Sequence, residues 1–234
     1  KRYYSRVLKK TNRIFRTLFY VGDSVYCEVC KWKGKRFFSR KCPKCNSVPR
    51  TRLVPYSLKF FNLIKENLKI LHIAPNVNEY RYIKNYVKSL NQYDRLDIKQ
   101  RKHTNIKRSI TDTKLPANAY DLVIAWHVLE HIPEDIQAIT EVYRILKKGG
   151  RFLVSVPIYP INNPETFEDS SITYDDYTKI HGHYDHCRSC GLDYYKRFED
   201  CGFLTEELKV KDLNSEVINL HDFKEDHIVW CFTK

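Results

Sequence analysis

The sequence lacks any apolar run long enough to cross a membrane, and it also lacks methionine, internal repeats and low-complexity stretches. A membrane helix needs roughly 20 apolar residues in succession, and no apolar signal-peptide core follows the basic first residues. We therefore expect a cytoplasmic protein, with peripheral contact to the inner face of the membrane as a further option. Because methionine is absent, we expect a start that has been trimmed or altered.

Positive charge is unevenly distributed along the chain. Residues 1–70 contain 19 Lys and Arg against 3 Asp and Glu, whereas residues 71–234 contain 22 against 25. A basic segment is typical of contact with nucleic acid or an anionic membrane. Since the excess is confined to the first third, we expect it to serve docking to an anionic surface, membrane or RNA. The positive charge of residues 1–70 gives no information about the substrate of residues 71–234.

Four segments follow one another in the sequence. Residues 1–26 predict a basic amphipathic helix, because its apolar side chains fall near one helical face. That helix either packs on the rest of the protein or lies on an anionic membrane or a nucleic-acid backbone. Residues 27–52 hold a metal-type segment, residues 53–68 a connecting helix or linker, and residues 69–234 the main domain.

Four of the eight cysteines form two closely spaced pairs. Cys27-x-x-Cys30 and Cys42-x-x-Cys45 are separated by eleven residues. In a reducing compartment such cysteines call for a metal or redox explanation before a disulfide one. Two pairs supply the tetrahedral set of four thiolates that Zn²⁺ favours. With no open position left, we expect a structural zinc ribbon that stabilises a segment too short for its own core.

From residue 69 the pattern alternates between strand-like runs and helical periodicity. Strands are expected at 69–74, 93–98, 106–110, 120–125 and 151–158, and helices at 78–90 and 133–146. This alternation predicts a three-layer α/β domain with a mostly parallel sheet. After a helix at 192–201, the strand-like runs 204–210 and 227–232 have no convincing helix between them. We therefore expect the last strand to pair antiparallel.

A parallel α/β sheet binds its cofactor at the carboxyl ends of the central strands. The first strand runs into Ala74, and the second ends at Asp97, an acid that can hold ribose hydroxyls. The third ends near where an adenine would lie, and the fourth ends beside His127. The residues expected to contact a cofactor are Ala74, Pro75, Asn76, Asp97, Ser109, Ile110, Asp112, Trp126 and His127.

The stretch LPANAYDLVIAWHVLEHIPEDIQAITEVYRILKKGGRFLVSVPI, residues 115–158, resembles the second half of a class I S-adenosylmethionine-dependent methyltransferase domain. The V-L-E-H-I-P segment followed by L-K-K-G-G carries most of the match. The chain is also similar to a bacterial group with LHIAP in place of a glycine-rich loop and a zinc-ribbon-like lead with CPKCNSVPRTRL. That group shares TFEDSSIT (166–173) and GHYDHCRSCGLDY (182–194). From about residue 69 onward, the resemblance implies a Rossmann-like sheet, S-adenosylmethionine and small-molecule or glycan-type acceptors.

The loop after the first strand departs from the usual pattern of that class. It has no glycine from Leu71 to Asn78, so a side chain must be accommodated where backbone usually approaches the methionine part. Asn76 stands where similar sequences have Glu, and Ser109 where they have Asp, although Asp112 can substitute. A decayed methyltransferase that only binds ligands is therefore an alternative.

Methyl transfer requires an oriented nucleophile and, for a hydroxyl, removal of a proton. His127 is expected to position the substrate or act as the base; it could also only shape the cofactor pocket. The long polar insert at 159–190 is expected to be a functional lid, in which Asp185 and His186 can form a carboxylate-supported base. The remaining candidates bind the polar substrate or are ordinary loop residues: Glu168, Asp169, His183 and Arg188.

The sequence contains two further candidate metal sites. Cys187 and Cys190 lie near several histidines, but they lack a second spaced pair, so a polar substrate loop is the preferred interpretation. Glu130 and His131 resemble the E-x-x-E-H divalent-metal sites of some methyltransferases, with His127 in place of the first acid.

Three functions compete. The first is methyl transfer to a small polar acceptor such as a sugar or glycan precursor. The second is an RNA methyltransferase of the ribosomal type, in which the basic ribbon grips phosphates. The near-neutral main domain and the acidic, histidine-rich insert argue against RNA in its active site. The third is a non-catalytic binding protein, which calorimetry with S-adenosylmethionine would separate from the others.

Overall fold

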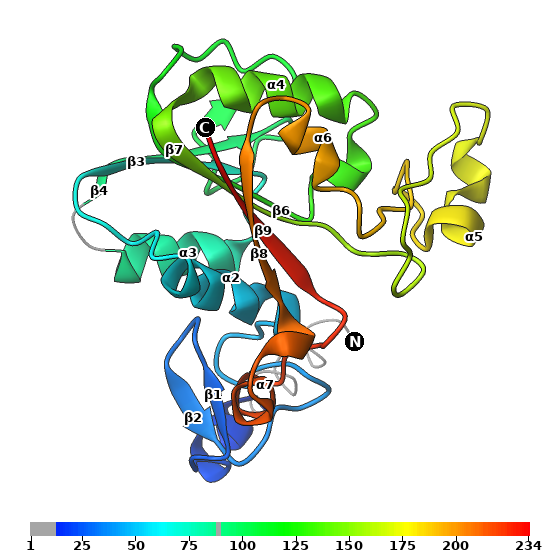
Figure 1. Cartoon of the computed structure of the whole chain (residues 1–234). Helices are drawn as coiled ribbons and strands as arrows, with labels where there is room; N and C mark the ends of the chain where they lie inside the picture. The colour runs from blue at the N-terminus through cyan, green and yellow to red at the C-terminus, as the bar shows by residue number, and fades with distance from the viewer. Residues whose placement is uncertain (1–12, 88–89) are drawn as a thin grey trace.

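One seven-stranded sheet, in the order β5-β4-β3-β6-β7-β9-β8, forms the centre of the molecule (Figure 1). The computed structural model describes residues 13–87 and 90–234. The strands are β3 (Leu68–Ile73), β4 (Leu90–Asp97), β5 (Ile106–Lys107), β6 (Tyr120–Trp126), β7 (Leu146–Ser155), β8 (Leu204–Lys209) and β9 (Ile228–Thr233). β3 to β7 pair in parallel, and β9 runs antiparallel to both neighbours. The expected Rossmann-like sheet with an antiparallel last strand is confirmed.

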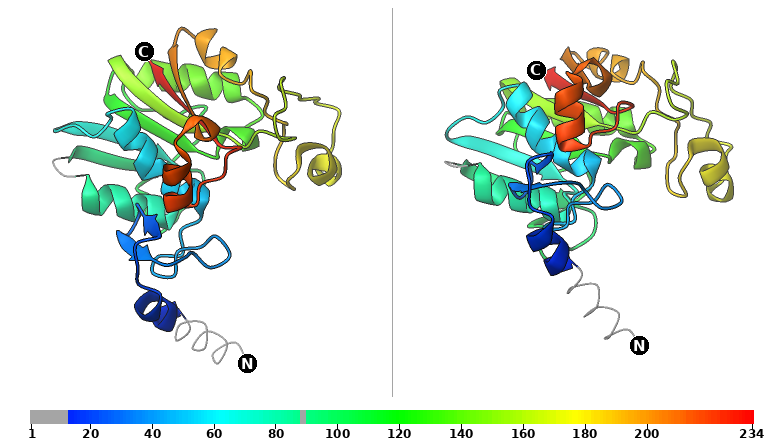
Figure 2. Two further views of the ribbon diagram at one scale, coloured as in Figure 1. Left: turned by 60° about the horizontal axis from the view of Figure 1, so that its bottom comes forward. Right: turned by 90° about the horizontal axis from the view of Figure 1, so that it is seen from below.

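Helices cover both faces of this sheet, as the views in Figures 1 and 2 show. α2 (Pro49–Phe60) and α3 (Val77–Tyr86) lie on one face, and α4 (Asp135–Ile145) and α6 (Lys196–Glu199) on the other. The central strands are buried on both faces, so their side chains alternate between two apolar clusters. This alternation decides which side chains of β6 can reach a ligand.

The zinc-ribbon segment shares its core with the main domain. β1 (Val25–Cys27) and β2 (Trp32–Gly34) form an antiparallel hairpin. Side chains of the ribbon, including Trp32 and Phe37, belong to the same buried cluster as Leu53 and Leu58 of α2. α2 begins at Pro49, within the range expected for the ribbon, and proline is favoured in the first helical turn. Residues 53–60, the first half of the 53–68 segment, are thus packed helix.

α7 (Ser215–His221) lies between β8 and β9, where the sequence showed no convincing helix. This expectation was wrong. Asn214 caps the helix by accepting a hydrogen bond from Glu216 N, and the half-buried Val217 and Ile218 pack on the shared core. Seven residues give too little periodicity to be recognised in the sequence. The antiparallel pairing of β8 and β9 is nevertheless as expected.

The remaining elements are short. They are the 3₁₀ turns η1 (Leu129–His131), η2 (Tyr174–Asp176) and η3 (Val210–Asp212), and the helix α5 (Tyr177–His181). The insert carrying α5 extends from one side of the sheet in Figure 1. Residues 13–19 of the expected N-terminal helix are helical, and its residues 1–12 lie outside the described residues. Within the described chain, the helices are too short or too polar to span a bilayer.

Candidate functional site

A cavity of about 490 Å³ lies at the carboxyl ends of β3, β4 and β6. Ala74, Asp97 and His127 follow or end these three strands and all line it. Its apolar wall consists of Ile73, Leu96, Ile98, Ile110, Val128 and Ile132. An apolar slot with one strand-end carboxylate suits a nucleoside, whose base is flat and whose ribose carries hydroxyls.

Two residues of this cavity have left-handed backbone conformations. Ala74 has φ 45° and His127 has φ 54°. A non-glycine residue in that region costs on the order of 1 kcal/mol, and such positions gather at functional sites. Ala74 is exposed, and its N–H donates to Leu96 O at 2.7 Å. The glycine-free loop therefore makes a turn that glycine adopts freely, with only a methyl group to accommodate.

Asp97 is only 4% exposed and lines the same cavity. Its Oδ1 accepts from Lys99 N at 2.8 Å, and its Oδ2 accepts from Arg101 Nε at 2.7 Å. The carboxylate is thereby fixed at the strand end. Ribose hydroxyls would donate hydrogen bonds to the same carboxylate that accepts one from Arg101.

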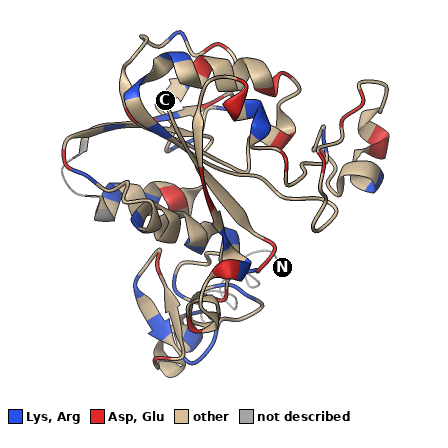
Figure 3. Cartoon of the chain, viewed as in Figure 1, with Lys and Arg blue, Asp and Glu red and all other residues tan. Residues whose placement is uncertain are grey.

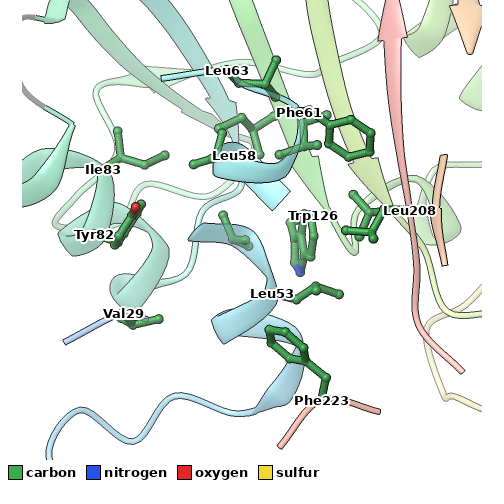
Figure 4. Close-up of a cluster of buried hydrophobic side chains, with 14 of the residues drawn as sticks. Val29, Leu53, Leu58, Phe61, Leu63, Tyr82, Ile83, Trp126, Leu208 and Phe223 are labelled. Atoms are coloured by element: carbon green, nitrogen blue, oxygen red, sulfur yellow. The ribbon is translucent and has the colours of Figure 1, made fainter. Parts of the chain in front are cut away.

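Other residues expected to contact the cofactor point elsewhere. The Trp126 side chain packs in the cluster between β6 and α2, near Leu53 (Figure 4). Pro75 is buried, and its carbonyl oxygen accepts a hydrogen bond from His103 Nε2 at 2.7 Å. Asn76 caps α3 by accepting from the N–H groups of Asn78 and Glu79. Trp126, Pro75 and Asn76 line neither this cavity nor the second cavity described below.

Of the three residues at the third strand end, only Ile110 lines the cavity. Ser109 Oγ is 2.7 Å from Thr111 Oγ1, so its hydroxyl is used within the turn. Asp112 is exposed and forms an ion pair with Lys114 at 2.8 Å. Asp112 therefore does not replace the acid that similar sequences have at position 109.

A second cavity, of about 610 Å³, adjoins the first. His127, His131 and Asp185 line both cavities, so the two meet at these side chains. The second cavity also takes residues from the ribbon, the start of α2, the insert and the loop before β9. Its basic residues, which sequence reasoning missed, are Arg40, Arg50 and Lys224. Of these three residues, only Arg50 could have been suspected from the sequence, since it falls within the CPKCNSVPRTRL segment.

Positive charge gathers around His227 on one side of this second cavity, whereas Glu130, Asp185 and Asp226 also line it. Burial, together with the nearby positive charges of His127, Lys224, Arg50 and Arg40, lowers the pKa of His227 to about 3. His227 is itself part of the cavity wall. The side of the cavity around His227 therefore favours a negative group of a ligand.

His127 and Glu130 are paired at the junction of the cavities. His127 Nδ1 lies 3.4 Å from Glu130 Oε1, and His127 Nε2 is buried with no hydrogen-bond partner among the described residues. Burial alone would raise the pKa of Glu130, but the contact with His127 and the charge of His131 outweigh it and lower that pKa. An ionised Glu130 would keep a proton on His127 Nδ1 and leave Nε2 as an acceptor.

Asp185 and His186 do not form the expected dyad. Asp185 Oδ1 instead contacts His183 Nδ1 and lies 3.3 Å from His131 Nδ1. Burial, together with the charges of His131 and His183, lowers the pKa of His186 to about 4. At neutral pH that imidazole is uncharged and a weak base. Neighbouring side chains on a loop point apart, so sequence adjacency was a poor guide.

Arg188 braces the insert and reaches neither cavity. It is 2% exposed and donates to Leu129 O at 2.6 Å, to Ile132 O at 2.7 Å and to Pro133 O at 2.9 Å. Its Nε donates to Glu168 Oε2 at 2.8 Å. Its donors are thus engaged with the protein, so a buried structural role replaces the expected contact with substrate.

The other insert candidates are likewise occupied or peripheral. Glu168 also forms an ion pair with Arg197 at 2.8 Å. Asp169 accepts hydrogen bonds from the N–H and hydroxyl of Ser171, which closes a turn. His183 does line the second cavity. Cys187 and Cys190 belong to none of the metal-type clusters that the described residues form.

The four ribbon cysteines converge on one point. The Sγ atoms of Cys27 and Cys45 are 3.6 Å apart, as are those of Cys30 and Cys42. A tetrahedral zinc site with Zn–S bonds of about 2.3 Å has sulfur–sulfur edges of roughly 3.8 Å. All four sulfurs lie within 4.8 Å of one another. The geometry fits Zn²⁺ and leaves no open coordination position.

Comparisons with known proteins agree with this sheet. Residues 76–154 match a family model described as a methyltransferase domain. A probable S-adenosylmethionine-dependent methyltransferase of Mycolicibacterium smegmatis is 36% identical over 66 residues, which are 28% of this chain and 23% of that protein. The chain therefore matches about a quarter of the length of this curated relative.

Solved structures show the same fold. An S-adenosylmethionine-dependent methyltransferase of Mesorhizobium loti has a TM-score of 0.58 at 12% identity, covering 76% of this chain and 96% of its own. One of Archaeoglobus fulgidus has a TM-score of 0.56 at 16% identity, covering 79% and 94%. The cyclase SpnF has a TM-score of 0.54 at 13% identity, covering 85% and 84%, so the fold alone does not fix the reaction. By its family match over residues 76–154 and by its sheet, this chain is similar to class I S-adenosylmethionine-dependent methyltransferases.

Proposed function

We propose that the protein transfers a methyl group from S-adenosylmethionine to a small polar acceptor that carries an anionic group, such as a phosphate- or carboxylate-bearing sugar or glycan precursor. The observation that carries this proposal is the meeting of two cavities at His127. One has apolar walls and a strand-end carboxylate, and the other has Arg40, Arg50 and Lys224 among its lining residues. A methyl donor and its acceptor need this kind of adjacency.

The first cavity suits the cofactor. Its isoleucine and valine walls offer surface to the adenine, and Asp97 offers acceptors to the ribose hydroxyls. S-adenosylmethionine, when bound, supplies an electrophilic methyl group on a sulfonium. The chain's own part is to orient the acceptor towards that cavity and to accept its proton.

His127 is suited to both tasks. Its Nε2 has no partner among the described residues, and Glu130 lies beside Nδ1 at 3.4 Å. A carboxylate at one ring nitrogen leaves the other free to accept a proton from an acceptor hydroxyl. His127 lines both cavities, so this residue lies at the junction between them.

The acceptor cavity is suited to an anion. Arg50 stands in the first turn of α2, a twelve-residue helix with no acidic residue in that turn. The positive end of a helix and a guanidinium together favour phosphate or carboxylate groups. Arg40 and Lys224 line the same wall. Lys and Arg also occur at several positions along the ribbon (Figure 3), so a ribosomal-type RNA acceptor is the second candidate.

The test combines calorimetry with a turnover assay. The protein should bind S-adenosylmethionine and methylate an anionic sugar from a panel that also contains neutral sugars and RNA. Absence of cofactor binding would leave the decayed, non-catalytic protein as the better hypothesis. Turnover on RNA alone, with an affinity that falls steeply as salt rises, would favour the second candidate.

Replacing Arg50 with alanine should weaken acceptor binding specifically. A charge-assisted hydrogen bond contributes about 1.5–3 kcal/mol, so KM for the anionic acceptor should rise roughly 10-fold or more while kcat changes little. Lys41→Ala is the matched control, because Lys41 is exposed on the same ribbon and does not line the cavity. Equal effects of both variants on KM would contradict a specific anion site.

The helix at residues 13–19 is proposed to dock on an anionic bilayer. One side of this helix contacts the ribbon, since Trp32 Nε1 donates a hydrogen bond to Thr17 O at 3.0 Å. Its apolar side chains are 49–65% exposed; they are Ile14, Phe15, Leu18 and Phe19. Figure 2 shows this helix projecting away from the sheet. An apolar face within a strongly basic segment matches the requirements of an interfacial helix.

Vesicle sedimentation tests this docking. The full chain should bind vesicles with anionic phospholipid, and bind them less at high salt. Phe15→Ser and Phe19→Ser should each weaken binding about 10-fold, because each ring contributes roughly 1–2 kcal/mol when it leaves water. Thr17→Ser, on the ribbon-facing side, is the control. Equal binding to neutral vesicles, or no effect of either phenylalanine change, would rule the proposal out.

A further inference from the structure

Glu130 presents a buried carboxylate beside the proposed acceptor, and its nearest cationic neighbour is His127 Nδ1 at 3.4 Å. It is 1% exposed, and neither side-chain oxygen has a hydrogen-bond partner among the described residues. A buried carboxylate without partners is costly, because the protein does not replace the hydrogen bonds of water. In native proteins such a group normally faces a cation or an unseen polar ligand.

The imidazole of His131 faces this carboxylate with a lone pair. Its Nδ1 lies 2.9 Å from the carbonyl oxygen of Asp185, and since a carbonyl only accepts, Nδ1 is the protonated nitrogen. In the neutral imidazole, Nε2 then carries the lone pair, and it lies 3.8 Å from Glu130 Oε1. Two acceptors that face each other repel unless a proton or a metal cation lies between them.

A third ligand comes from the insert. The ring of His186 lies 4.8 Å from that of His131, in an edge-to-face arrangement. One ligand atom from each of Glu130, His131 and His186 falls within 4.8 Å of the other two. Three donor atoms from two distant segments, residues 130–131 and 186, thus surround one point.

We propose that Glu130, His131 and His186 bind a divalent first-row transition ion, separate from the ribbon zinc. Two imidazoles and one carboxylate are a common donor set for such ions, and three protein ligands leave open positions. All three residues line the second cavity. The open positions therefore face the site of the acceptor, whose oxygen atoms are suitable further ligands.

The surroundings of these residues hold the ligands in place. The carbonyl of Asp185 fixes the tautomer and the orientation of His131, as partners of metal-binding histidines commonly do. Cys187 N donates to Glu130 O at 3.0 Å, which ties the insert to the turn η1. Arg188 donates to the carbonyls of Leu129 and Ile132 on either side. The buried Arg188 thus stabilises the turn that carries Glu130 and His131.

Occupancy of this metal site is independent of methyl transfer, whereas a role of the ion in binding the acceptor rests on the proposed function. The experiment therefore measures metal binding in the absence of S-adenosylmethionine. Co²⁺ is added to the full chain with its ribbon already loaded with zinc, and visible absorption is recorded. Binding by nitrogen and oxygen ligands should give weak d–d bands without the intense near-ultraviolet band of cobalt–thiolate bonds.

Three variants test the assignment of the ligands. Glu130→Gln and His186→Ala should each weaken Co²⁺ binding by at least about 10-fold, because ligand loss exceeds the effect of losing a supporting partner. His183→Ala is the matched control: His183 is a neighbouring, more exposed histidine that should be dispensable. Circular dichroism and thermal unfolding of the zinc-loaded variants establish that each one is folded. Co²⁺ should also raise the unfolding temperature of the native chain and not that of the Glu130 and His186 variants.

Three outcomes would overturn the proposal. Thiolate bands alone would mean that Co²⁺ enters only the ribbon. Unchanged binding in both Glu130→Gln and His186→Ala would place the ion elsewhere. Loss of binding in His183→Ala, with Glu130→Gln unaffected, would assign it to the exposed group of His183, Asp185 and His186. Normal Co²⁺ binding by a chain that transfers no methyl group would leave the metal site standing and reject only the proposed activity.

Discussion

Loss of the ribbon zinc is expected to abolish acceptor binding while S-adenosylmethionine binding survives. A structural zinc site stabilises its fold by an apparent 10–16 kcal/mol or so in isolated peptides, which is comparable to the whole stability of a domain. The acceptor cavity takes Arg40 and Arg50 from the ribbon and the start of α2. The cofactor cavity is built from the strand ends, η1 and the insert, without any ribbon residue.

The zinc experiment uses Cys42→Ser together with chelation of the native chain. The native protein should contain about one ribbon zinc, and hydrogen exchange should show a protected ribbon that opens when the zinc is removed. Cys201→Ser is the control, because Cys201 is remote from the four clustered thiols. A metal-free chain with a protected ribbon and normal acceptor KM would contradict the structural role of the zinc.

The effect of zinc loss should extend into the main domain through Arg52. This side chain is fully buried and donates to Ser47 O at 2.8 Å and to His221 O at 2.8 Å, so it joins the ribbon to the end of α7. Its guanidinium also lies 3.9 Å from the centre of the Phe37 ring. When the ribbon opens, a buried charge loses part of its hydrogen bonding, which is strongly unfavourable. Lower thermal stability of the whole chain is therefore expected as well.

The features that sequence predicted well are local or periodic. The zinc ligands follow from the spacing of Cys27, Cys30, Cys42 and Cys45, because a short knuckle fixes where its thiolates point. The sheet follows from the alternation of apolar strands and amphipathic helices. The rule that ligands bind at strand ends pointed to Ala74, Asp97, Ile110 and His127, and all four line the cavity that we propose for the cofactor.

The direction of individual side chains was less predictable. Alternate residues of a strand point to the same face, so Trp126 could have been assigned to the face of Ile124, under α2. Instead, both Trp126 and His127 were expected to contact the cofactor, because both stand at the end of the strand. Arg188 looked like a ligand for an acidic substrate, since sequence does not reveal that three backbone carbonyls surround it. Burial of a charge depends on contacts between distant segments.

The acceptor cavity could not be found from sequence because distant segments build it. Arg40, Glu130, His186 and Lys224 come from the ribbon, from η1, from the insert and from the loop before β9. None of these lies at a spacing that signals a shared site. Their meeting depends on the packing of the ribbon against α7, a helix that the sequence also failed to indicate.

Replacing His127 with glycine should reduce kcat by roughly 10²- to 10⁴-fold, the usual contribution of a positioned general base. Glycine suits this position because the backbone has φ 54°, which glycine adopts without strain. Loss of the ring removes the unpartnered Nε2 at the junction of the two cavities. S-adenosylmethionine should still bind, since the apolar wall and Asp97 remain.

Chemical rescue separates a base from a residue that only shapes the cofactor pocket. Added imidazole can enter the space left in His127→Gly and should restore part of kcat, whereas it should do nothing for His127→Asn, which keeps the space filled and tolerates a left-handed backbone. A pocket-shaping histidine would instead show weaker S-adenosylmethionine binding with kcat largely kept. Because Glu130 adjoins both His127 and His131, loss of the ring can also disturb the proposed metal site. Co²⁺ binding by His127→Gly, measured alongside kcat, therefore shows whether the rate falls through loss of the base or through loss of the ion.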